Sequence, residues 1–197
     1  GENPIKAAIP VFLWTEAVLR GPELGAQDGL TGTEKLRHPV KLIWSVASNI
    51  LINQHANINR TAQILRDEKR VEFIAVQDQF LTPSARFADL VLPVCMHFET
   101  WGVNDGWKYS EELLLLPKLV DPPGECLSDF EIGRRIAAHL GVEQEYSENR
   151  DEKGWLEWLL GIYREKRFPD LPSLDEMLEK NLGIWTRKVT HPKVALE

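Results

Sequence analysis

Six polar residues stand where a ligand could be bound, either shortly after short apolar segments or at the start of a predicted helix. They are Ser48, Asn49, Gln77, Asp78, Thr100 and Asp129. The apolar segments that precede most of them, residues 41–46, 71–76 and 90–93, have the length and composition of buried strands. Open parallel α/β sheets bind ligands beyond the carboxyl ends of their strands, so these residues are candidates for one binding edge.

The residue types favour a nucleotide-like ligand. A carboxylate such as Asp78 or Asp129 can accept both the N1–H and the N2–H₂ of a guanine. A loop of small residues such as 47–49 can offer backbone N–H groups to a diphosphate. Residue types alone leave a flavin or another nucleotide open. No GxGxxG, no GxxxxGK[ST] and no GxSxG sequence is present.

Structural roles compete with ligand binding at each of these positions. Asn49 could be a turn residue that tolerates a positive φ, and Asp78 could cap the turn that follows it. Asp129 could complement the dipole of a helix, and Glu99 could be a solvated loop acid. His55 and His97 are interpreted as ordinary surface or half-buried histidines.

Composition limits the classes of function. The 197 residues carry a net charge of −7 without a cluster of basic residues, which argues against sequence-independent nucleic-acid binding. Cys95 and Cys126 have no metal-ligand spacing and are interpreted as buried or half-buried thiols, with one disulfide left open. No histidine pair has the HxxxH spacing, and no apolar run approaches the ~20 residues of a membrane span.

The pattern of elements predicts an α/β protein with a parallel, Rossmann- or flavodoxin-like three-layer sheet and a helical C-terminal extension. Strands are expected at 9–14, 41–46, 71–76, 90–93 and 113–116, and helices at 15–20, 57–67, 128–140, about 155–162 and 173–181. The strand at 41–46 does not alternate, which predicts burial on both faces. We expect residues 1–40 to be an N-terminal strand, helix and loop, 41–142 the core, 143–195 the extension, and 196–197 a vector remnant.

Several segments resemble a known family. They are 9–21 (IPVFLWTEAVLRG), 41–55 (KLIWSVASNILINQH), 57–61 (NINRT) and 75–93 (AVQDQFLTPSARFADLVLP). The string D-x-x-x-T-x-[ST]-A-x-x-A-D-x-x-L-P, residues 78–93, resembles the molybdopterin oxidoreductase superfamily. The Asn-Gln-His stretch at 53–55 resembles its dimethyl sulfoxide reductase branch, and the resemblance runs from about residue 9 to about residue 189.

The resemblance implies that the chain is an internal fragment of a larger molybdenum oxidoreductase and contributes to binding one molybdopterin guanine dinucleotide. Asn49, Gln77, Asp78 and Asp129 correspond to cofactor-binding positions of the family, and Ser48, in the same small-residue loop as Asn49, is expected to bind with them. Thr100 stands where several relatives have a cofactor-contacting lysine and offers only a hydroxyl. No catalytic or metal-ligating residue is expected in this chain, which should be inactive alone.

The resemblance also implies the context of the parent protein. The parent would hold a bis-molybdopterin guanine dinucleotide with molybdenum, carry an iron–sulfur cluster elsewhere, and reduce an S-oxide, N-oxide or similar acceptor in anaerobic respiration. Its expected partners are its own other domains, an electron-transfer iron–sulfur subunit and a membrane anchor subunit. The parent itself is expected outside the cytoplasmic membrane, associated with it through a partner subunit. The alternatives are a stand-alone flavodoxin-like nucleotide-binding module and a pure interaction domain.

Overall fold

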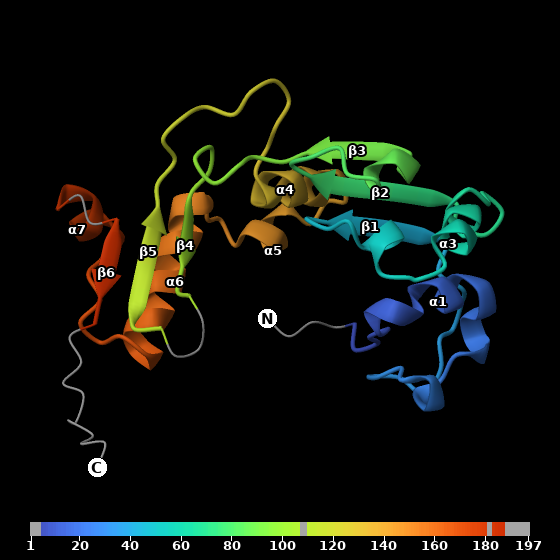
Figure 1. Cartoon of the computed structure of the whole chain (residues 1–197). Helices are drawn as coiled ribbons and strands as arrows, with labels where there is room; N and C mark the ends of the chain where they lie inside the picture. Colours follow the sequence, from blue (N-terminus) through green and yellow to red (C-terminus); the bar gives the residue numbers. More distant parts are fainter. Residues whose placement is uncertain (1–4, 107–109, 181–182, 188–197) are drawn as a thin grey trace, which may run out of the picture. The chain divides into compact units, whose positions relative to one another are not determined.

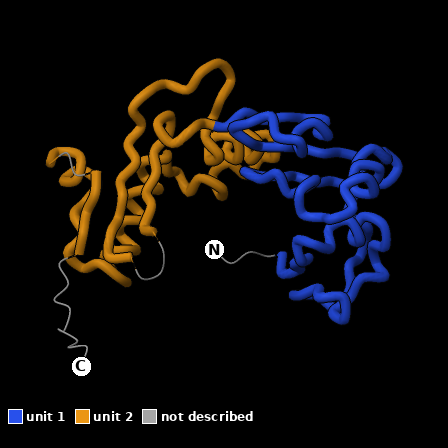
Figure 2. The backbone as a smooth tube through the Cα atoms, in the orientation of Figure 1, with its two compact units in different colours: residues 1–94 blue, residues 95–197 orange. Residues whose placement is uncertain are grey.

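The computed structural model describes residues 5–106, 110–180 and 183–187. The chain forms two compact units, unit 1 with residues 1–94 and unit 2 with residues 95–197 (Figure 2). The division falls between Val94 and Cys95, inside the range 41–142 for which one core was expected. Among the described residues, no helix is both long and apolar enough to span a membrane.

Unit 1 is built on a parallel sheet of three strands in the order β1-β2-β3 (Figure 1). The strands are β1 (Leu42–Val46), β2 (Phe73–Asp78) and β3 (Leu90–Pro93). Between β1 and β2 the chain forms α2 (Ile50–Asn53) and α3 (Ile58–Leu65), and η4 (Ala85–Phe87) lies between β2 and β3. The predicted α/β class and its three parallel strands are therefore confirmed.

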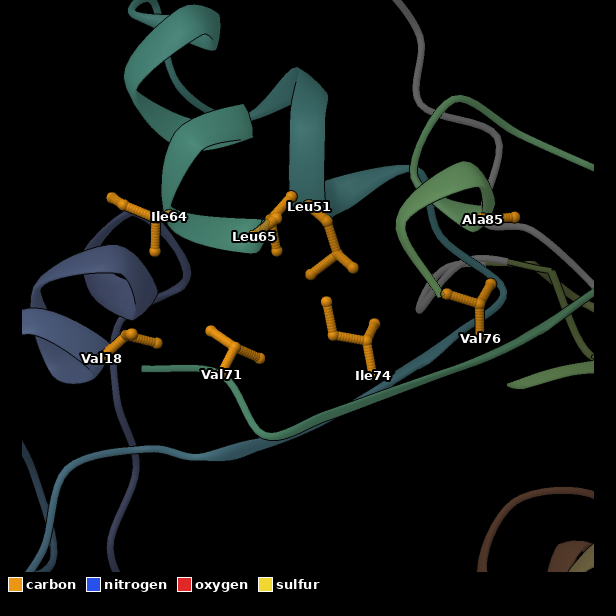
Figure 3. Close-up of a cluster of buried hydrophobic side chains, with 8 residues drawn as sticks. All are labelled: Val18, Leu51, Ile64, Leu65, Val71, Ile74, Val76 and Ala85. Carbon is orange, nitrogen blue, oxygen red and sulfur yellow. The ribbon is translucent and has the colours of Figure 1, made fainter. Parts of the chain in front are cut away.

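One face of this sheet carries the core of unit 1. Ile74 and Val76 of β2 pack against residues of the helices (Figure 3). The partly buried Ile43 of β1 also packs against this cluster. The helical side chains in this cluster are Val18, Leu51, Ile64, Leu65 and Ala85. The buried residues of α3 are Thr61, Ile64 and Leu65, and Ile58 at its start is exposed.

The opposite face of β1 is open. Leu42, Trp44 and Val46 are 61%, 45% and 47% exposed, so the prediction that this strand is buried on both faces is wrong for the described chain. The prediction holds for β2, where Ile74 to Gln77 are all buried. The absence of alternation in β1 arises because apolar side chains occupy both faces, although only one of them is covered.

The segment before β1 differs from the prediction at its start. Residues 9–14, expected as a strand, form η1 (Val11–Leu13) and the first residue of α1 (Trp14–Arg20). A short apolar run fits a strand or a buried helix equally well, and here the backbone bond from Leu13 N to Pro10 O begins a helical turn. The rest of α1 agrees with the predicted helix, and it ends at Gly21 with φ 49°. The irregular stretch to β1 contains η2 (Gly21–Glu23) and η3 (Ala26–Asp28).

Unit 2 contains an antiparallel sheet of three strands in the order β4-β5-β6. They are β4 (Gly102–Asn104), β5 (Glu112–Leu116) and β6 (Ile184–Thr186). The strand predicted at 113–116 is confirmed as β5, but its neighbours are antiparallel strands rather than the parallel sheet. The C-terminal extension was expected to be helical only, and β6 corrects that expectation.

The described part of unit 2 also contains the helices α4 (Asp129–His139), α5 (Glu143–Ser147), α6 (Glu152–Lys166) and α7 (Leu174–Glu179). Ser173 and Glu176 form a capping box at the start of α7. At the start of α4, the Ser128 side chain accepts from Glu131 N. Helices α6 and α7 bury a second core against β5. Its members are Leu113, Leu115, Leu156, Leu160, Phe168, Leu171, Leu174 and Met177.

Candidate functional site

Unit 1 brings four of the six predicted site residues to one edge of its sheet. In the parallel register Val46 pairs with Gln77, and Asp78 pairs with Pro93, so the carboxyl ends of the three strands coincide. Ser48 and Asn49 follow β1 directly, and Gln77 and Asp78 close β2. We call the residues 47–49 and 77–78 the carboxyl edge of unit 1.

The chain leaves β1 through an unusual backbone conformation at Ala47. Its φ is 48°, and its N–H donates to the Gln77 carbonyl oxygen at 2.8 Å. A left-handed conformation costs an alanine about 1–2 kcal/mol, so the rest of the edge must hold it in place. Sequence reasoning missed Ala47 because alanine carries no turn signal. Asn49, for which a positive φ was considered, has φ −93°.

Asn49 fixes the loop after β1 to the turn that precedes β3. Its Oδ1 accepts from Ser84 N at 3.0 Å and from Ser84 Oγ at 2.8 Å. Its backbone oxygen accepts from Asn53 N at 3.3 Å and so begins α2, a short helix that the sequence analysis did not predict. The side-chain amide nitrogen of Asn49 makes no hydrogen bond within the described part of the chain.

Ser48 shapes the same loop. Its Oγ accepts from Ile50 N at 3.1 Å, and its carbonyl oxygen accepts from Ser45 Oγ at 3.3 Å. The Ser48 hydroxyl keeps its own proton for a further acceptor, because an oxygen that accepts one bond can still donate another.

Asp78 has both a structural role and unused capacity. Its Oδ1 accepts from Phe80 N at 3.0 Å, which confirms the interpretation that it caps the following turn. Its Oδ2 makes no hydrogen bond to any described residue, and the residue is half-buried. Gln77 beside it is only 3% exposed and contributes its backbone oxygen to Ala47. One carboxylate oxygen of Asp78 therefore remains available at the carboxyl edge.

Unit 2 holds the other two predicted residues. Thr100 and Asp129 line a cavity of about 300 Å³ whose apolar wall includes Trp101, Phe130 and Trp155. The Thr100 hydroxyl donates to Glu152 Oε2 at 3.4 Å, and Ser128 Oγ donates to the other oxygen of the same carboxylate. Glu152 was missed by sequence reasoning, since nothing in its surroundings distinguishes it from a solvated glutamate.

Asp129 is exposed in the first turn of α4, where its charge complements the helix dipole. Burial first, and the negative charge of Asp129 second, raise the pKa of the Tyr146 hydroxyl. Glu99 is a half-buried loop acid, and its side chain also accepts from Met96 N at 2.8 Å in an exposed contact.

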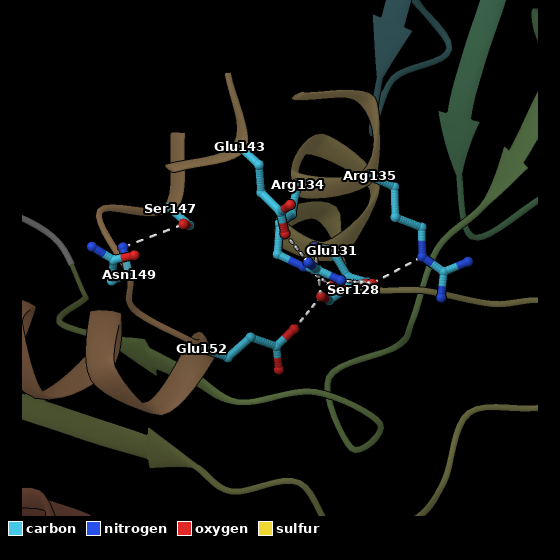
Figure 4. Close-up of polar contacts among 8 residues, drawn as sticks. All are labelled: Ser128, Glu131, Arg134, Arg135, Glu143, Ser147, Asn149 and Glu152. Atoms are coloured by element: carbon cyan, nitrogen blue, oxygen red, sulfur yellow. Dashed lines mark hydrogen bonds and ion pairs between the residues drawn. The ribbon is translucent and has the colours of Figure 1, made fainter. Parts of the chain in front are cut away.

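A larger cavity of about 660 Å³ in unit 2 is lined by many charged residues, and a group of them bond one another. Glu131 bonds Arg134 at 2.7 and 2.9 Å and Arg135 at 2.9 Å, and Arg134 also pairs with Glu143 (Figure 4). The hydrogen bonds from Arg134, then those from Arg135, lower the pKa of Glu131 to about 2 against the cost of its desolvation. This network is a structural brace rather than a ligand site.

The described cysteines and histidines are not grouped as metal ligands. Cys95 is buried and Cys126 is half-buried, as interpreted from the sequence, and the two thiols are not joined in a disulfide. Burial, followed by the charge of Glu99, raises the pKa of Cys95. His55 packs edge-on against Trp14 with ring centroids 5.5 Å apart. In the described ranges, no group of three or more His, Cys, Asp or Glu residues could hold a metal ion.

Comparison with known proteins identifies the class to which this fold and edge belong. The family model "Molybdopterin oxidoreductase" matches residues 15–139, and the chain belongs to that family. It is 39% identical to dimethyl sulfoxide reductase DmsA of Escherichia coli (strain K12), over 92% of this chain and 22% of the relative. It is 32% identical to biotin sulfoxide reductase of Cereibacter sphaeroides, over 84% of this chain and 21% of the relative.

The solved structure of acetylene hydratase from Pelobacter acetylenicus is similar in fold. It has a TM-score of 0.58 and 23% identity, and the match covers 90% of this chain and 20% of that one. The chain thus spans about a fifth of the length of the proteins that it resembles. Membership of the family implies a molybdenum–pterin cofactor, and the α/β fold agrees with this assignment.

Proposed function

We propose that this chain supplies part of the binding site for one molybdopterin guanine dinucleotide in a larger oxidoreductase. The observation that carries the proposal is the carboxyl edge of unit 1. There, a strained small-residue loop, the amide of Asn49 and the second carboxylate oxygen of Asp78 meet at the end of a parallel sheet. Parallel α/β sheets bind nucleotides at such edges.

The donors and acceptors present fit this group. The Oδ2 of Asp78 is unused, and its Oδ1 has a second lone pair beside the one that accepts from Phe80 N. The two oxygens together can therefore accept the N1–H and the N2–H₂ of guanine in a charge-assisted pair. The Asn49 amide nitrogen and the Ser48 hydroxyl can donate to phosphate or carbonyl oxygens. Gln77 closes the same edge. The bound cofactor would supply the molybdenum chemistry, and Ser48, Asn49, Gln77 and Asp78 would hold and orient its nucleotide. Thr100 and Asp129 remain predicted binding residues of unit 2, where they line a separate cavity.

For the parent protein we propose reduction of an S-oxide, an N-oxide or a similar acceptor in anaerobic respiration. The relatives are a dimethyl sulfoxide reductase, a trimethylamine-N-oxide reductase and a biotin sulfoxide reductase, which supports this substrate class. An iron–sulfur cluster elsewhere in the parent, an electron-transfer iron–sulfur subunit, a membrane anchor subunit and an extracytoplasmic location belong to the same proposal. This chain alone is expected to be inactive.

Calorimetric titration of the chain with GDP and with ADP tests the binding part of the proposal. A half-site of this kind is expected to bind GDP with a Kd of roughly 1 mM, about 4 kcal/mol. ADP offers an adenine N6–H₂ donor but no N1–H donor beside it, so the same carboxylate can accept only one bond and ADP binds more weakly. Equal binding of GDP and ADP would show that no carboxylate reads guanine here.

A further inference from the structure

Ser84 determines which end of the Asn49 amide faces outward. Ser84 is fully buried, and its backbone N–H and its hydroxyl both point at one atom of the Asn49 side chain. A backbone N–H can only donate, so the atom that meets it must be the amide oxygen. The amide nitrogen of Asn49 is consequently turned away from Ser84 with both of its protons.

Both partners of this contact are held by the surrounding structure. The turn of Ser84 is closed by Ala85 N donating to Thr82 Oγ1 at 3.2 Å and by Phe87 N donating to Ser84 O at 3.1 Å. Ala85, the next residue, lies in the core of unit 1. On the other side, Ala47 is bonded to the end of β2. Ser84 therefore cannot follow Asn49 if the amide rotates.

We infer that Ser84 is a positioning residue that fixes Asn49 as a hydrogen-bond donor toward the ligand. The ligand atom that meets Asn49 is then an acceptor, a phosphate or carbonyl oxygen, and not an N–H group. At the carboxyl edge, Asn49 then donates hydrogen bonds to the ligand and Asp78 accepts them. This inference rests on the proposed function for the identity of the ligand, but the orientation of the amide can be tested without any ligand.

The orientation is tested by NMR on the labelled wild-type chain. A through-hydrogen-bond scalar coupling is expected between the Ser84 amide nitrogen and the Asn49 side-chain carbonyl carbon. In a GDP titration, the side-chain N–H₂ signals of Asn49 should shift and saturate with the same Kd as the calorimetric signal. If the coupling is absent under conditions that show the couplings of the β1–β2 ladder, the inference is overturned.

Asn49→Asp separates positioning from binding. The aspartate keeps an oxygen for both Ser84 donors, so the urea midpoint at pH 7 should be equal or higher. It places a second oxygen where the N–H₂ was, so GDP affinity should fall about ten-fold or more. Asn53→Asp, an exposed residue of α2, adds the same charge near the same edge and should lower affinity less than about two-fold.

Ser84→Ala and Ser84→Thr test the positioning residue itself. Alanine removes one of the two donors, and GDP affinity should fall about five-fold. Threonine keeps the hydroxyl and should restore the affinity; if its extra methyl unfolds the buried turn, the coupling and the Asn49→Asp result still decide. Unchanged GDP affinity in Asn49→Asp overturns the inference alone, whereas no GDP binding by the wild-type chain overturns the proposed function as well.

Discussion

The two units use their polar residues differently. In unit 2, Glu131, Arg134 and Glu143 satisfy one another, and Glu152 accepts from two hydroxyls of its own unit. In unit 1, Asn49 and Asp78 each use one side-chain oxygen to hold the fold and keep a second polar atom without a described partner. Polar side chains whose atoms all bond within the unit stabilise its fold. Polar side chains that are fixed by one bond and keep a second atom without a partner can bind a ligand.

The two units also differ in how completely their sheets are covered. In unit 2, β5 is covered by α6 and α7, and Leu113, Leu160, Phe168 and Met177 are fully buried. In unit 1, the helices cover one face of the sheet, and β1 exposes Leu42, Trp44 and Val46 on the other. Purely parallel sheets are normally covered on both faces. The exposed apolar face of β1 therefore indicates a surface that packs against further protein.

The largest expected effect comes from the core of unit 2. Phe168 is fully buried against Tyr163 and Trp185, so Phe168→Ala should cost about 3–5 kcal/mol of unfolding free energy. Urea denaturation followed by NMR signals from each unit measures the loss. If the two units unfold independently, the signals of β1 and β2 should keep their wild-type urea midpoint. Parallel loss of both sets of signals would show that the units form one cooperative core.

The strands of unit 1 were predictable because each is a short apolar run between polar segments. Their parallel arrangement then placed Ser48, Asn49, Gln77 and Asp78 at one edge. The sequence did not reveal the partners of β5, because strand pairing is decided by contacts between distant segments such as β6. Ser84 lies in a string that marks the family, but its bond to Asn49 joins residues 35 positions apart.

The next largest effect concerns binding at the carboxyl edge. Asp78→Asn keeps an oxygen for Phe80 N, so the turn and the fold should be retained. An amide nitrogen would then face the guanine N–H donors, and about 1.5–3 kcal/mol of binding should be lost. Calorimetry with GDP measures the loss, and Asp67→Asn is the control. Asp67 also accepts from a backbone N–H two residues later, but it lies before β2 and away from the carboxyl edge. Equal losses in the two variants would mean that only net charge matters.

An intermediate effect on stability should appear at acid pH in unit 2. The pKa of Glu131 is lowered from about 4.5 to about 2, so its contribution is complete above 4.5 and disappears as pH falls toward 2. Because its arginine partners are partly exposed, we expect the contribution to be about 1–2 kcal/mol, less than the full shift implies. Glu131→Gln should therefore destabilise the chain at pH 6 and differ little from wild type near pH 2. A constant difference between the two pH values would exclude an ionic origin.

The smallest effect tests the strain at the carboxyl edge. Ala47→Gly relieves a left-handed alanine but adds freedom to the unfolded chain, so the net gain should be between 0 and about 1 kcal/mol. Gly141 also has a left-handed backbone, with φ 75°. The opposite substitution there, Gly141→Ala, should destabilise the chain by a similar amount. Thermal unfolding of both variants measures the pair. Destabilisation by Ala47→Gly of more than ~1 kcal/mol would show that the alanine methyl has a packing role instead.

The most direct test of the account is a map of the residues that respond to GDP. Backbone and side-chain NMR signals of the labelled chain would be followed to several times the expected Kd of roughly 1 mM. The account predicts the largest shifts at residues 47–49, 77–79 and 84 of unit 1, with the Asn49 amide protons among them. Shifts concentrated on the charged network of Glu131 and Arg134, or none at the end of β1, would contradict it.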